Sequence, residues 1–213
     1  MALADVYDAV GLTAPPVAVL WDMDGTILDT EVEWMKQSGE VAKSHGGIWN
    51  DELAESTYGV SSHAQYDQVM SQAIIDGGGE PVSGEELLLE LGLRMARIYV
   101  RADLIPGAVE LLEAFQAAGI PQALVTAAPG ELLHCVADSL DTDYFATMIS
   151  GSAQIPGKPN PAPYLTAAMQ LEVAAEKCLV FEDSTPGIKS ANYAGAHVVD
   201  VLKQPLAGLA ELL

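Results

Sequence analysis

Basic residues are scarce in this sequence. Its 213 residues include nine lysines and arginines against 30 aspartates and glutamates, and the formal net charge at pH 7 is −21. Nucleic acids and anionic membrane surfaces require a basic face on the proteins that bind them. The composition therefore argues against both classes of partner, and the excess acids are expected to form a solvated surface that aids solubility.

Cysteines and long apolar runs are scarce as well. The two cysteines, Cys135 and Cys178, lie far apart and each has apolar neighbours, which favours buried free thiols over a disulfide or a catalytic thiol. No apolar run approaches the ~20 residues of a membrane-spanning helix, and the sequence does not open on a basic segment followed by an apolar stretch. We expect a cytoplasmic protein with no membrane partner, and we predict a monomer.

Apolar residues, by contrast, are abundant. They make up 50% of the sequence, although only 6% of the residues are aromatic. A chain of this length and composition can bury a sizeable core. The sequence therefore predicts a globular protein of one or two domains.

The stretch from Val17 to Thr30 carries the most informative motif. Its first five residues are apolar, as is typical of a strand that is buried on both faces of a parallel sheet. Asp22 and Asp24 follow on one side of the extended chain, and Gly25 supplies backbone freedom. Buried carboxylates are costly without a cation or hydrogen-bond donors, so the pattern favours a metal site with one carboxylate free to react. The alternative is a turn in which the aspartates cap local backbone.

Two regions of different pattern follow this motif. Residues 31–104 show helical patterns and no good strand, with helices predicted at 32–45, 51–57, 61–76 and 85–101. Residues 105–213 alternate between helix patterns and strand patterns. Strands are predicted at 122–127, 147–150, 178–182 and 197–201, and helices at 106–118, 131–139, 161–170 and 186–194.

These patterns predict an α/β fold with two domains. The catalytic core, residues 1–30 and 105–213, is expected to form a doubly wound parallel sheet of five strands. Residues 31–104 are expected to form a smaller helical domain inserted after the first strand. Residues 1–16 are predicted to be a short lead-in that ends at Pro15-Pro16.

Doubly wound sheets bind ligands beyond the carboxyl ends of their strands, and polar residues follow the second predicted strand. The hydroxyl of Thr126 and the backbone N–H beside it, at Ala127, could hold a phosphate oxygen. Helix capping by Thr126 is the alternative. In the loop from Gly157 to Pro161, Lys158 stands between prolines, and such a stiff loop suits a charge placed beside a phosphoryl group. An ordinary surface lysine is the alternative there.

Acidic residues also follow the predicted strand at 178–182. Glu182 ends this apolar run and Asp183 follows it, which repeats the acidic ending of the first strand. Both acids could therefore join a metal site at the same edge of the sheet. The alternative is helix capping by Asp183 or Ser184.

The order of these motifs resembles the four signatures of the haloacid dehalogenase superfamily. The sequence has D-x-D-G-T, then a threonine at the second strand end, then G-K-P, then E-D-S-x-x-G-I. Its stretches GKPNPAPY and FEDSTPGIKSANYAG are similar to the β-phosphoglucomutase and sugar-phosphatase branch. The resemblance implies a Rossmann-like core and an inserted α-helical cap that closes over the active site and supplies substrate specificity.

The resemblance also implies a role for each matching residue. Asp22 would be the nucleophile and Asp24 the general acid and base. Thr126, Ala127 and Lys158 would hold the transferring phosphoryl group, and Asp22, the Asp24 carbonyl, Glu182 and Asp183 would hold or orient Mg²⁺.

Such a set suits phosphoryl transfer on chemical grounds as well. A carboxylate that attacks phosphorus splits one hard displacement into two easier ones. Mg²⁺ prefers oxygen ligands, and a lysine can neutralise the charge on the phosphoryl oxygens. One carboxyl group can protonate the leaving alcohol and then deprotonate the attacking water.

The predicted function is hydrolysis of a small phosphomonoester, a sugar or polyol phosphate. A dehalogenase would need neither Asp24 nor the metal ligands. A β-phosphoglucomutase-type mutase is an open alternative, but those enzymes carry G-V-S-R in the cap, where the arginine holds a second phosphate. The similar stretch here is Gly59-Val60-Ser61-Ser62, so serine stands in place of that arginine. A non-catalytic module that binds a phosphorylated ligand is the third alternative.

The residues of the helical region that could contact a substrate are less defined. Solvated helix faces are the ordinary explanation for most polar residues there. The candidates are Glu31, Lys36, Lys43, His45, Ser61, Ser62, His63, Gln65, Arg94, Arg97 and Arg101.

Overall fold

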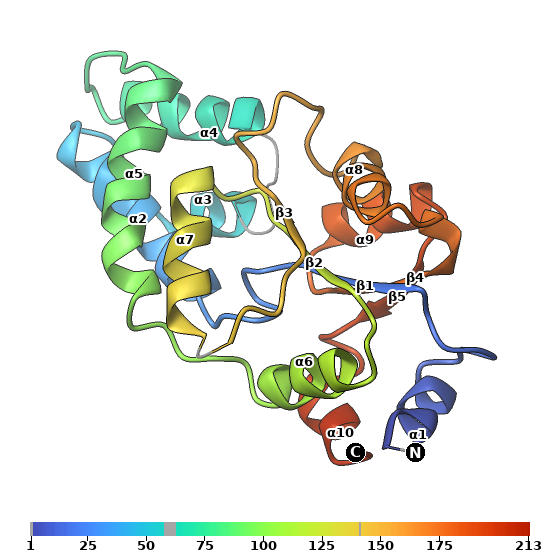
Figure 1. Ribbon diagram of the computed structural model, residues 1–213. Coiled ribbons are helices and arrows are strands. Elements are labelled where there is room, and N and C mark those ends of the chain that lie inside the picture. Colours follow the sequence, from blue (N-terminus) through green and yellow to red (C-terminus); the bar gives the residue numbers. More distant parts are fainter. Residues whose placement is uncertain (1, 58–62, 141) are drawn as a thin grey trace.

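The centre of the protein is a five-stranded parallel sheet with the order β3-β2-β1-β4-β5 (Figure 1). The structure, a computed structural model, describes residues 2–57, 63–140 and 142–213. The strands are β1 (Ala18–Trp21), β2 (Gln122–Val125), β3 (Thr147–Ile149), β4 (Cys178–Glu182) and β5 (His197–Asp200). The predicted doubly wound sheet is confirmed, and β1 lies in its middle, where the strand order reverses.

Helices cover both faces of this sheet. Alternate residues of β1 point to opposite sides: Val19 and Trp21 join the core that contains Phe115 of α6, whereas Leu20 joins the core that contains Tyr164 of α8. The helices of the α/β part are α1 (Ala2–Ala9), α6 (Ala108–Ala117), α7 (Gly130–Ser139), α8 (Ala162–Gln170), α9 (Thr185–Tyr193) and α10 (Leu206–Ala210), with a 3-10 turn at Ala175–Lys177.

A polar contact inside the core fixes β1 beside β2. The indole N–H of Trp21 donates to Oε1 of Gln122 (2.9 Å), and Nε2 of Gln122 donates to the carbonyl oxygen of Leu112 (2.9 Å). On its other side, the Trp21 ring stacks on Phe181 of β4 with 4.4 Å between ring centroids. These contacts hold the carboxyl end of β1 between the ends of β2 and β4.

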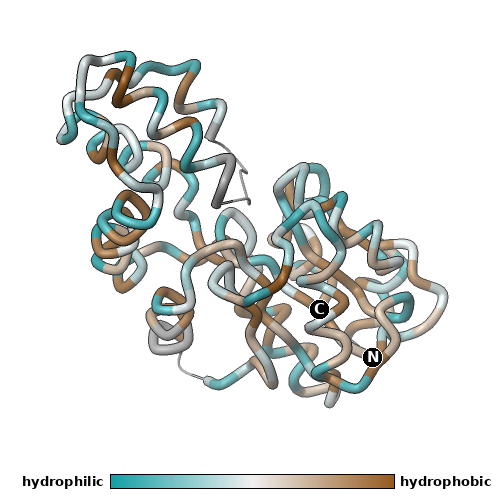
Figure 2. The backbone as a smooth tube through the Cα atoms, turned by 90° about the horizontal axis from the view of Figure 1, so that it is seen from above, coloured by the Kyte–Doolittle hydropathy of each residue, from teal (hydrophilic) through white to brown (hydrophobic). Residues whose placement is uncertain are grey.

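Four helices follow β1 and lie together on one side of the sheet (Figures 1 and 2). They are α2 (Glu31–Ser44), α3 (Asp51–Thr57), α4 (His63–Asp76) and α5 (Gly84–Tyr99), and the described residues between 31 and 99 contain no strand. We call them the inserted helices. The four predicted helices are therefore confirmed, except that the predicted start of the third, at Ser61 and Ser62, lies outside the described residues. The division into a core domain and a cap domain stays a prediction.

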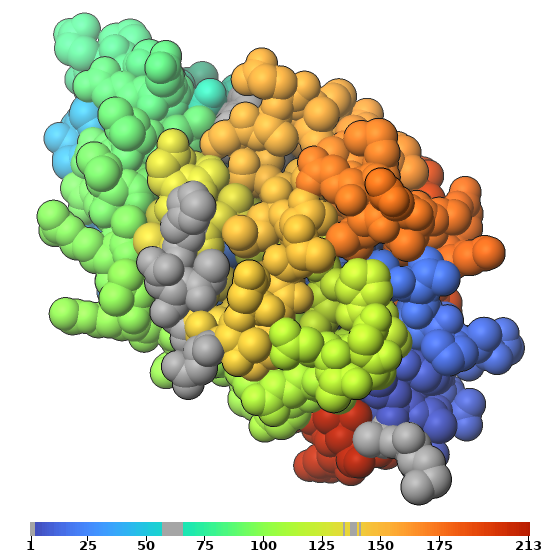
Figure 3. Space-filling view, viewed as in Figure 1, coloured from blue at the N-terminus to red at the C-terminus, as the bar shows by residue number. Residues whose placement is uncertain are grey.

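The chain enters and leaves the inserted helices at adjacent points. Leu28 and Leu104 form an isolated antiparallel bridge, the N–H of Asp29 donates to the carbonyl oxygen of Asp103 (2.9 Å), and the N–H of Ile105 donates to that of Ile27 (2.8 Å). The far end of the insertion is thus hydrogen-bonded to its beginning. The helix α5 also packs against α7 of the α/β part (Figure 3).

The first residues form an element that the sequence prediction missed. Residues 1–16 were expected to be a lead-in, but Ala2–Ala9 is the helix α1. Leu3, Val6 and Val10 are buried in the core, and their spacing is that of one helix face. Nε2 of His197 donates to the carbonyl oxygen of Val10 (2.6 Å) and ties the end of this segment to β5.

The two cysteines are free, and Cys178 is buried as predicted. Cys135 is only partly buried, because it lies on α7 with its thiol beside the carbonyl oxygen of Glu131, so the prediction of a buried thiol was wrong there. Within the ranges that the structure describes, we find no helix with the length and apolar character needed to cross a membrane.

Candidate active site

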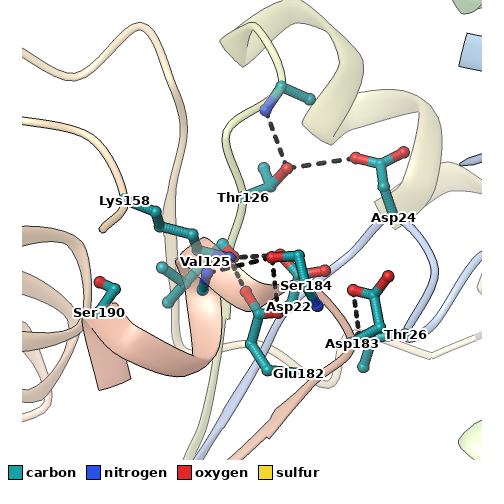
Figure 4. Close-up of polar contacts among 12 residues, drawn as sticks. Asp22, Asp24, Thr26, Val125, Thr126, Lys158, Glu182, Asp183, Ser184 and Ser190 are labelled. Atoms are coloured by element: carbon teal, nitrogen blue, oxygen red, sulfur yellow. Dashed lines mark hydrogen bonds and ion pairs between the residues drawn. The ribbon is translucent and has the colours of Figure 1, made fainter. Parts of the chain in front are cut away.

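The ends of β1, β2 and β4 bring the predicted site residues together (Figure 4). Asp22 follows β1, Thr126 follows β2, and Glu182 and Asp183 lie at the end of β4, while Lys158 reaches the same place from the loop before α8. In parallel sheets the carboxyl ends of all strands meet at one edge. Chain segments more than 100 residues apart are thereby placed around one point.

Lys158 is buried and paired with two acids. Its Nζ lies 2.5 Å from Oδ1 of Asp22 and 2.5 Å from Oε1 of Glu182, and it donates to the carbonyl oxygen of Val125 at 3.2 Å. The interpretation of Lys158 as an ordinary surface lysine was therefore wrong. Burial alone would lower the pKa of this ammonium group, but attraction to Asp22 and Glu182 outweighs burial and raises the pKa well above its usual value. Lys158 thus stays positively charged.

Glu182 is held by donors on both of its oxygens. Oε1 accepts from Lys158 and from the hydroxyl of Tyr164 (3.1 Å), and Oε2 accepts from the backbone N–H (2.8 Å) and hydroxyl (3.0 Å) of Ser184. The Ser184 hydroxyl also accepts from the N–H of Gly187 and caps α9, so the helix-capping alternative was right for Ser184. Gly187 is required here, because a Cβ at this position would lie 1.5 Å from Oε1 of Glu182.

We predict that Gly187→Ala will strongly destabilise the folded protein. The added methyl group must displace the Glu182 carboxylate from Lys158, which leaves a buried ion pair broken and should lower the free energy of unfolding by about 3 kcal/mol or more. Urea unfolding measures this change. Gly208→Ala is the matched control, since nothing lies within 4 Å of its added Cβ. Equal unfolding midpoints for the two variants would contradict the prediction.

Asp22, Glu182 and Asp183 could hold a metal ion. Each offers a carboxylate oxygen, and the three atoms lie within 4.8 Å of one another. Oδ1 of Asp183 accepts from the hydroxyl of Thr26 (3.4 Å), whereas Oδ2 is buried without a hydrogen-bond partner among the described residues. A buried carboxylate oxygen without a donor is costly, and a cation would satisfy it. The donor set, all hard oxygen atoms, fits Mg²⁺.

Gly25 allows this approach of Asp183. Its φ of +79° is unfavourable for other residues, and a Cβ there would lie 2.3 Å from Oδ2 of Asp183. The same Cβ would lie 3.2 Å from Cγ of Glu31, the first residue of α2. Gly25 therefore lies between a predicted metal ligand and a carboxyl group of the inserted helices.

Acidic groups outnumber basic groups among the described residues of this site. Burial and the neighbouring Glu182 raise the pKa of Asp22 well above its usual value, against the opposing effect of Lys158. Burial and Glu182 raise the pKa of Asp183 to about 7, and burial with Asp183 and Asp24 raises the pKa of Glu31 to about 8. A divalent cation would lower all three pKa values, because it stabilises the ionised carboxylates.

The Asp24 carboxylate is held away from this acidic cluster. Its Oδ1 accepts hydrogen bonds from the hydroxyl of Thr30 (2.6 Å), from Nε1 of Trp34 (2.9 Å) and from the hydroxyl of Tyr99. Its Oδ2 accepts from the hydroxyl of Thr126 at 3.4 Å. The carboxylate is not one of the three clustered ligands, so its predicted contribution to a metal site would come from the carbonyl oxygen and stays a prediction.

The hydroxyl of Thr126 lies beside Asp24, and its predicted contact with a phosphoryl group stays a prediction. The hydroxyl accepts from the N–H of Ala128 (2.9 Å) and donates to Asp24, whereas the Thr126 N–H is used by the sheet, where it donates to the carbonyl oxygen of Ile149 (2.9 Å). Thr126 does not cap α7, which begins at Gly130 after Pro129. Ala127 follows Thr126 directly, and its predicted role stays a prediction.

The candidates from the inserted helices mostly lie elsewhere. Glu31 is beside the acidic cluster. Lys36 and Lys43 pair with acids of their own helix, His45 and Arg94 pair with Glu90, and Arg97 and Arg101 are exposed. Ser61 and Ser62 lie outside the described residues, as do the side chains of His63 and Gln65.

Two residues of the inserted helices that contact Asp24, Trp34 and Tyr99, were missed by the sequence interpretation, as was Thr30 just before them. Trp34 and Tyr99 lie 10 and 75 residues from Asp24 along the chain. Both occur in amphipathic helices, where an aromatic residue is ordinarily part of the core. No sequence signal distinguishes them from such core residues.

The chain is similar to known hydrolases and phosphatases. A family model described as haloacid dehalogenase-like hydrolase matches residues 17–195. The phosphorylated carbohydrates phosphatase of Thermotoga maritima is 31% identical over 179 residues, which cover 84% of this chain and 81% of the relative. Hexitol phosphatase A of Escherichia coli is 28% identical over 187 residues, which cover 85% of this chain and 81% of the relative.

A solved structure shows the same fold. β-Phosphoglucomutase from Clostridium difficile matches with a TM-score of 0.68 and 22% identity, over 86% of this chain and 83% of the other. The family model spans all the strand-end residues described above, from Asp22 to Asp183. The chain belongs to the haloacid dehalogenase-like hydrolase family, as its motifs predicted.

Proposed function

We propose that this enzyme is a phosphatase that hydrolyses a small phosphomonoester, a sugar or polyol phosphate, through an aspartyl phosphate on Asp22. One observation carries the proposal: a buried, charged lysine lies against Asp22 at the centre of the sheet edge, and a second carboxyl group, Asp24, is held nearby. The relatives named for phosphorylated carbohydrates and hexitol support the substrate class.

In the first step, the Asp22 carboxylate attacks phosphorus. The new bond joins an Asp22 oxygen to phosphorus, and the bond between phosphorus and the oxygen of the leaving alcohol breaks. Asp24, in its protonated form, gives its proton to that oxygen. Lys158 and the hydroxyl of Thr126 stabilise the negative charge on the transferring phosphoryl group.

In the second step, water attacks the phosphorus of the aspartyl phosphate. Asp24, now a carboxylate, takes a proton from this water, and the bond between phosphorus and the Asp22 oxygen breaks. The products are inorganic phosphate and the original Asp22 carboxylate. Asp24 ends the cycle protonated, ready for the next leaving group.

The residues suited to hold Mg²⁺ are Asp22, Asp183 and the carbonyl oxygen of Asp24, with Glu182 beside them. When bound, the cation would offset the repulsion between the Asp22 carboxylate and the anionic phosphate. Glu182 has a second task, because it fixes the Lys158 ammonium group on the side of Asp22.

The alternative of a phosphosugar mutase depends on a residue that the structure does not describe. A mutase must retain a bisphosphate while it turns round, which requires a cation in the inserted helices as well as Lys158. The sequence places Ser62 where such an arginine would stand. Loss of a charge-assisted contact of about 1.5–3 kcal/mol should weaken retention by roughly one to two orders of magnitude. We therefore propose hydrolysis.

The test is a panel of sugar, polyol and nucleoside phosphates with Mg²⁺, assayed for released phosphate. A companion assay uses β-glucose 1-phosphate with a trace of the 1,6-bisphosphate, and follows glucose 6-phosphate and phosphate together. We expect net phosphate release from a sugar or polyol phosphate. Isomerisation much faster than phosphate release would favour the mutase instead.

We also predict a pH-dependent stability that Mg²⁺ removes. Because the pKa of Asp183 is about 7 in the folded chain and lower in the unfolded one, the folded state binds more protons. Stability without metal should therefore fall as the pH rises from about 4 to about 7, and Glu31, with a pKa of about 8, extends this range. Mg²⁺ should oppose the loss, since it binds ionised ligands of the folded state.

Thermal unfolding at about pH 5 and about pH 8, with EDTA or with excess Mg²⁺, measures this effect. The Asp183→Asn variant is the control, because it keeps the shape of the side chain but cannot ionise. It should lose less stability over the same pH range and gain less from Mg²⁺. An equal gain from Mg²⁺ in both proteins would contradict the assignment of Asp183 as a ligand.

A further inference from the structure

The hydrogen bonds of Asp24 link the α/β part to the inserted helices. Of the donors to Oδ1, Thr30 immediately precedes α2, Trp34 lies in its first turn, and Tyr99 is the last residue of α5. Trp34 also donates from Nε1 to the hydroxyl of Tyr99 (3.1 Å), and the two rings pack edge to face. One carboxylate oxygen therefore receives donors from both ends of the insertion.

Tyr99 is suited to remain a donor. Its side chain is fully buried, and because its hydroxyl oxygen already accepts from Trp34, the hydroxyl proton is directed at Oδ1 of Asp24. Trp34 can only donate through its indole nitrogen. In this arrangement both groups therefore act as donors to Oδ1 of Asp24.

The arrangement distinguishes the two oxygens of Asp24. A proton on Oδ1 would face the hydrogen atoms of the three described donors to this oxygen, which is unfavourable. Among the described contacts, Oδ2 accepts from Thr126 at the longer distance of 3.4 Å, on the side of the predicted phosphoryl site. The exchangeable proton of Asp24 is therefore best placed on Oδ2, where a leaving-group oxygen can reach it.

We propose that Trp34 and Tyr99 are positioning residues that fix Oδ1 of Asp24, so that Oδ2 carries the proton to the leaving group while the inserted helices pack on the core. The inference rests on the proposed phosphatase function. Both residues lie close in sequence to the hydrogen-bonded points where the chain enters and leaves the inserted helices. Displacement of α5 from this place would remove a donor from Asp24, which couples acid catalysis to the position of the inserted helices.

The test uses two substrates of similar size that differ in their leaving groups. Benzyl phosphate releases a basic alkoxide that needs a proton, whereas 4-nitrophenyl phosphate releases a stable phenolate that does not. The ratio kcat/KM reports the steps up to departure of this group. In Tyr99→Phe and in Trp34→Phe, we expect kcat/KM for benzyl phosphate to fall on the order of 10- to 100-fold, part of the 10²–10⁴-fold that general acid catalysis contributes. For 4-nitrophenyl phosphate it should change little.

The control is Tyr66→Phe, which also removes a buried hydroxyl from the inserted helices. Tyr66 contacts Ser38, and none of the described hydrogen bonds joins it to Asp24, so we expect both esters to be hydrolysed as by the wild type. Thermal unfolding of each variant checks the fold, and Trp34→Phe keeps the test valid if Tyr99→Phe is unstable. Losses of equal size on both esters, or no loss, would overturn the inference and leave the phosphatase standing. A wild type that hydrolyses neither these esters nor any phosphate of the panel would overturn both proposals.

Discussion

Asp22→Asn is expected to reduce phosphatase turnover by at least about 1,000-fold, because an amide cannot attack phosphorus and removal of a nucleophile leaves little of the rate. Initial rates with the best substrate of the panel, in Mg²⁺, measure the loss. The fold should survive, since Lys158 keeps its contact with Glu182 when the charge of Asp22 is removed. Circular dichroism and the unfolding midpoint check this expectation.

The matched control for this variant is Asp200→Asn, another aspartate at the carboxyl end of a strand. Asp200 lies at the end of β5 and pairs with the exposed Lys203. A surface ion pair contributes about 0–1 kcal/mol, and the residue is no part of the proposed mechanism. We expect wild-type turnover. Substantial activity in a folded Asp22→Asn variant would refute the covalent mechanism.

Lys158→Met is expected to damage both stability and catalysis. It leaves Asp22 and Glu182 buried without their shared cation, and breaking such a pair costs about 3–5 kcal/mol. Turnover should fall by roughly 10²–10³-fold, because the variant cannot stabilise the transferring phosphoryl group. Lys158 normally lowers the pKa of Asp22, so its loss raises that pKa further. The destabilisation should therefore be greater at about pH 8 than at about pH 5.

Two comparisons separate the ion pair from a general effect of the substitution. Lys177→Met removes an exposed lysine and should change the free energy of unfolding by less than about 0.5 kcal/mol. The double variant Lys158→Met with Asp22→Asn should be more stable than the sum of the single effects predicts, because one of the two stranded charges is gone. Simple additivity in urea unfolding would show that Asp22 and Lys158 do not interact.

The strands and their polar ends could be predicted from the sequence because burial requires a continuous run of apolar residues in each strand. A strand covered on both faces must be continuously apolar, so Asp22, Thr126 and Asp183 stand out where the apolar runs stop. The charge of Lys158 stands out in the same way in a chain poor in cations. A site that requires charged groups beside buried strands can therefore be recognised from the sequence alone.

Other features depend on contacts that leave no such pattern. The strand order follows from packing between distant segments. The partners of Asp24 from the inserted helices are a tryptophan and a tyrosine, and both look like ordinary core residues in sequence. The helix α1 was missed for another reason: Leu3, Val6 and Val10 have helical spacing, but a segment of eight residues gives a weak signal.

The chain enters and leaves the inserted helices at Leu28 and Leu104, which are bridged to each other, and this arrangement affects how the architecture can change. A segment whose two ends are neighbours can be lengthened, shortened or replaced without moving the sheet that carries it. The nucleophile and its lysine would keep their places in such an exchange. Recombination in evolution, or the grafting of another helical insertion in the laboratory, could thus replace the inserted helices as a single module and leave Asp22 and Lys158 in place, provided that the new segment supplies donors to Asp24.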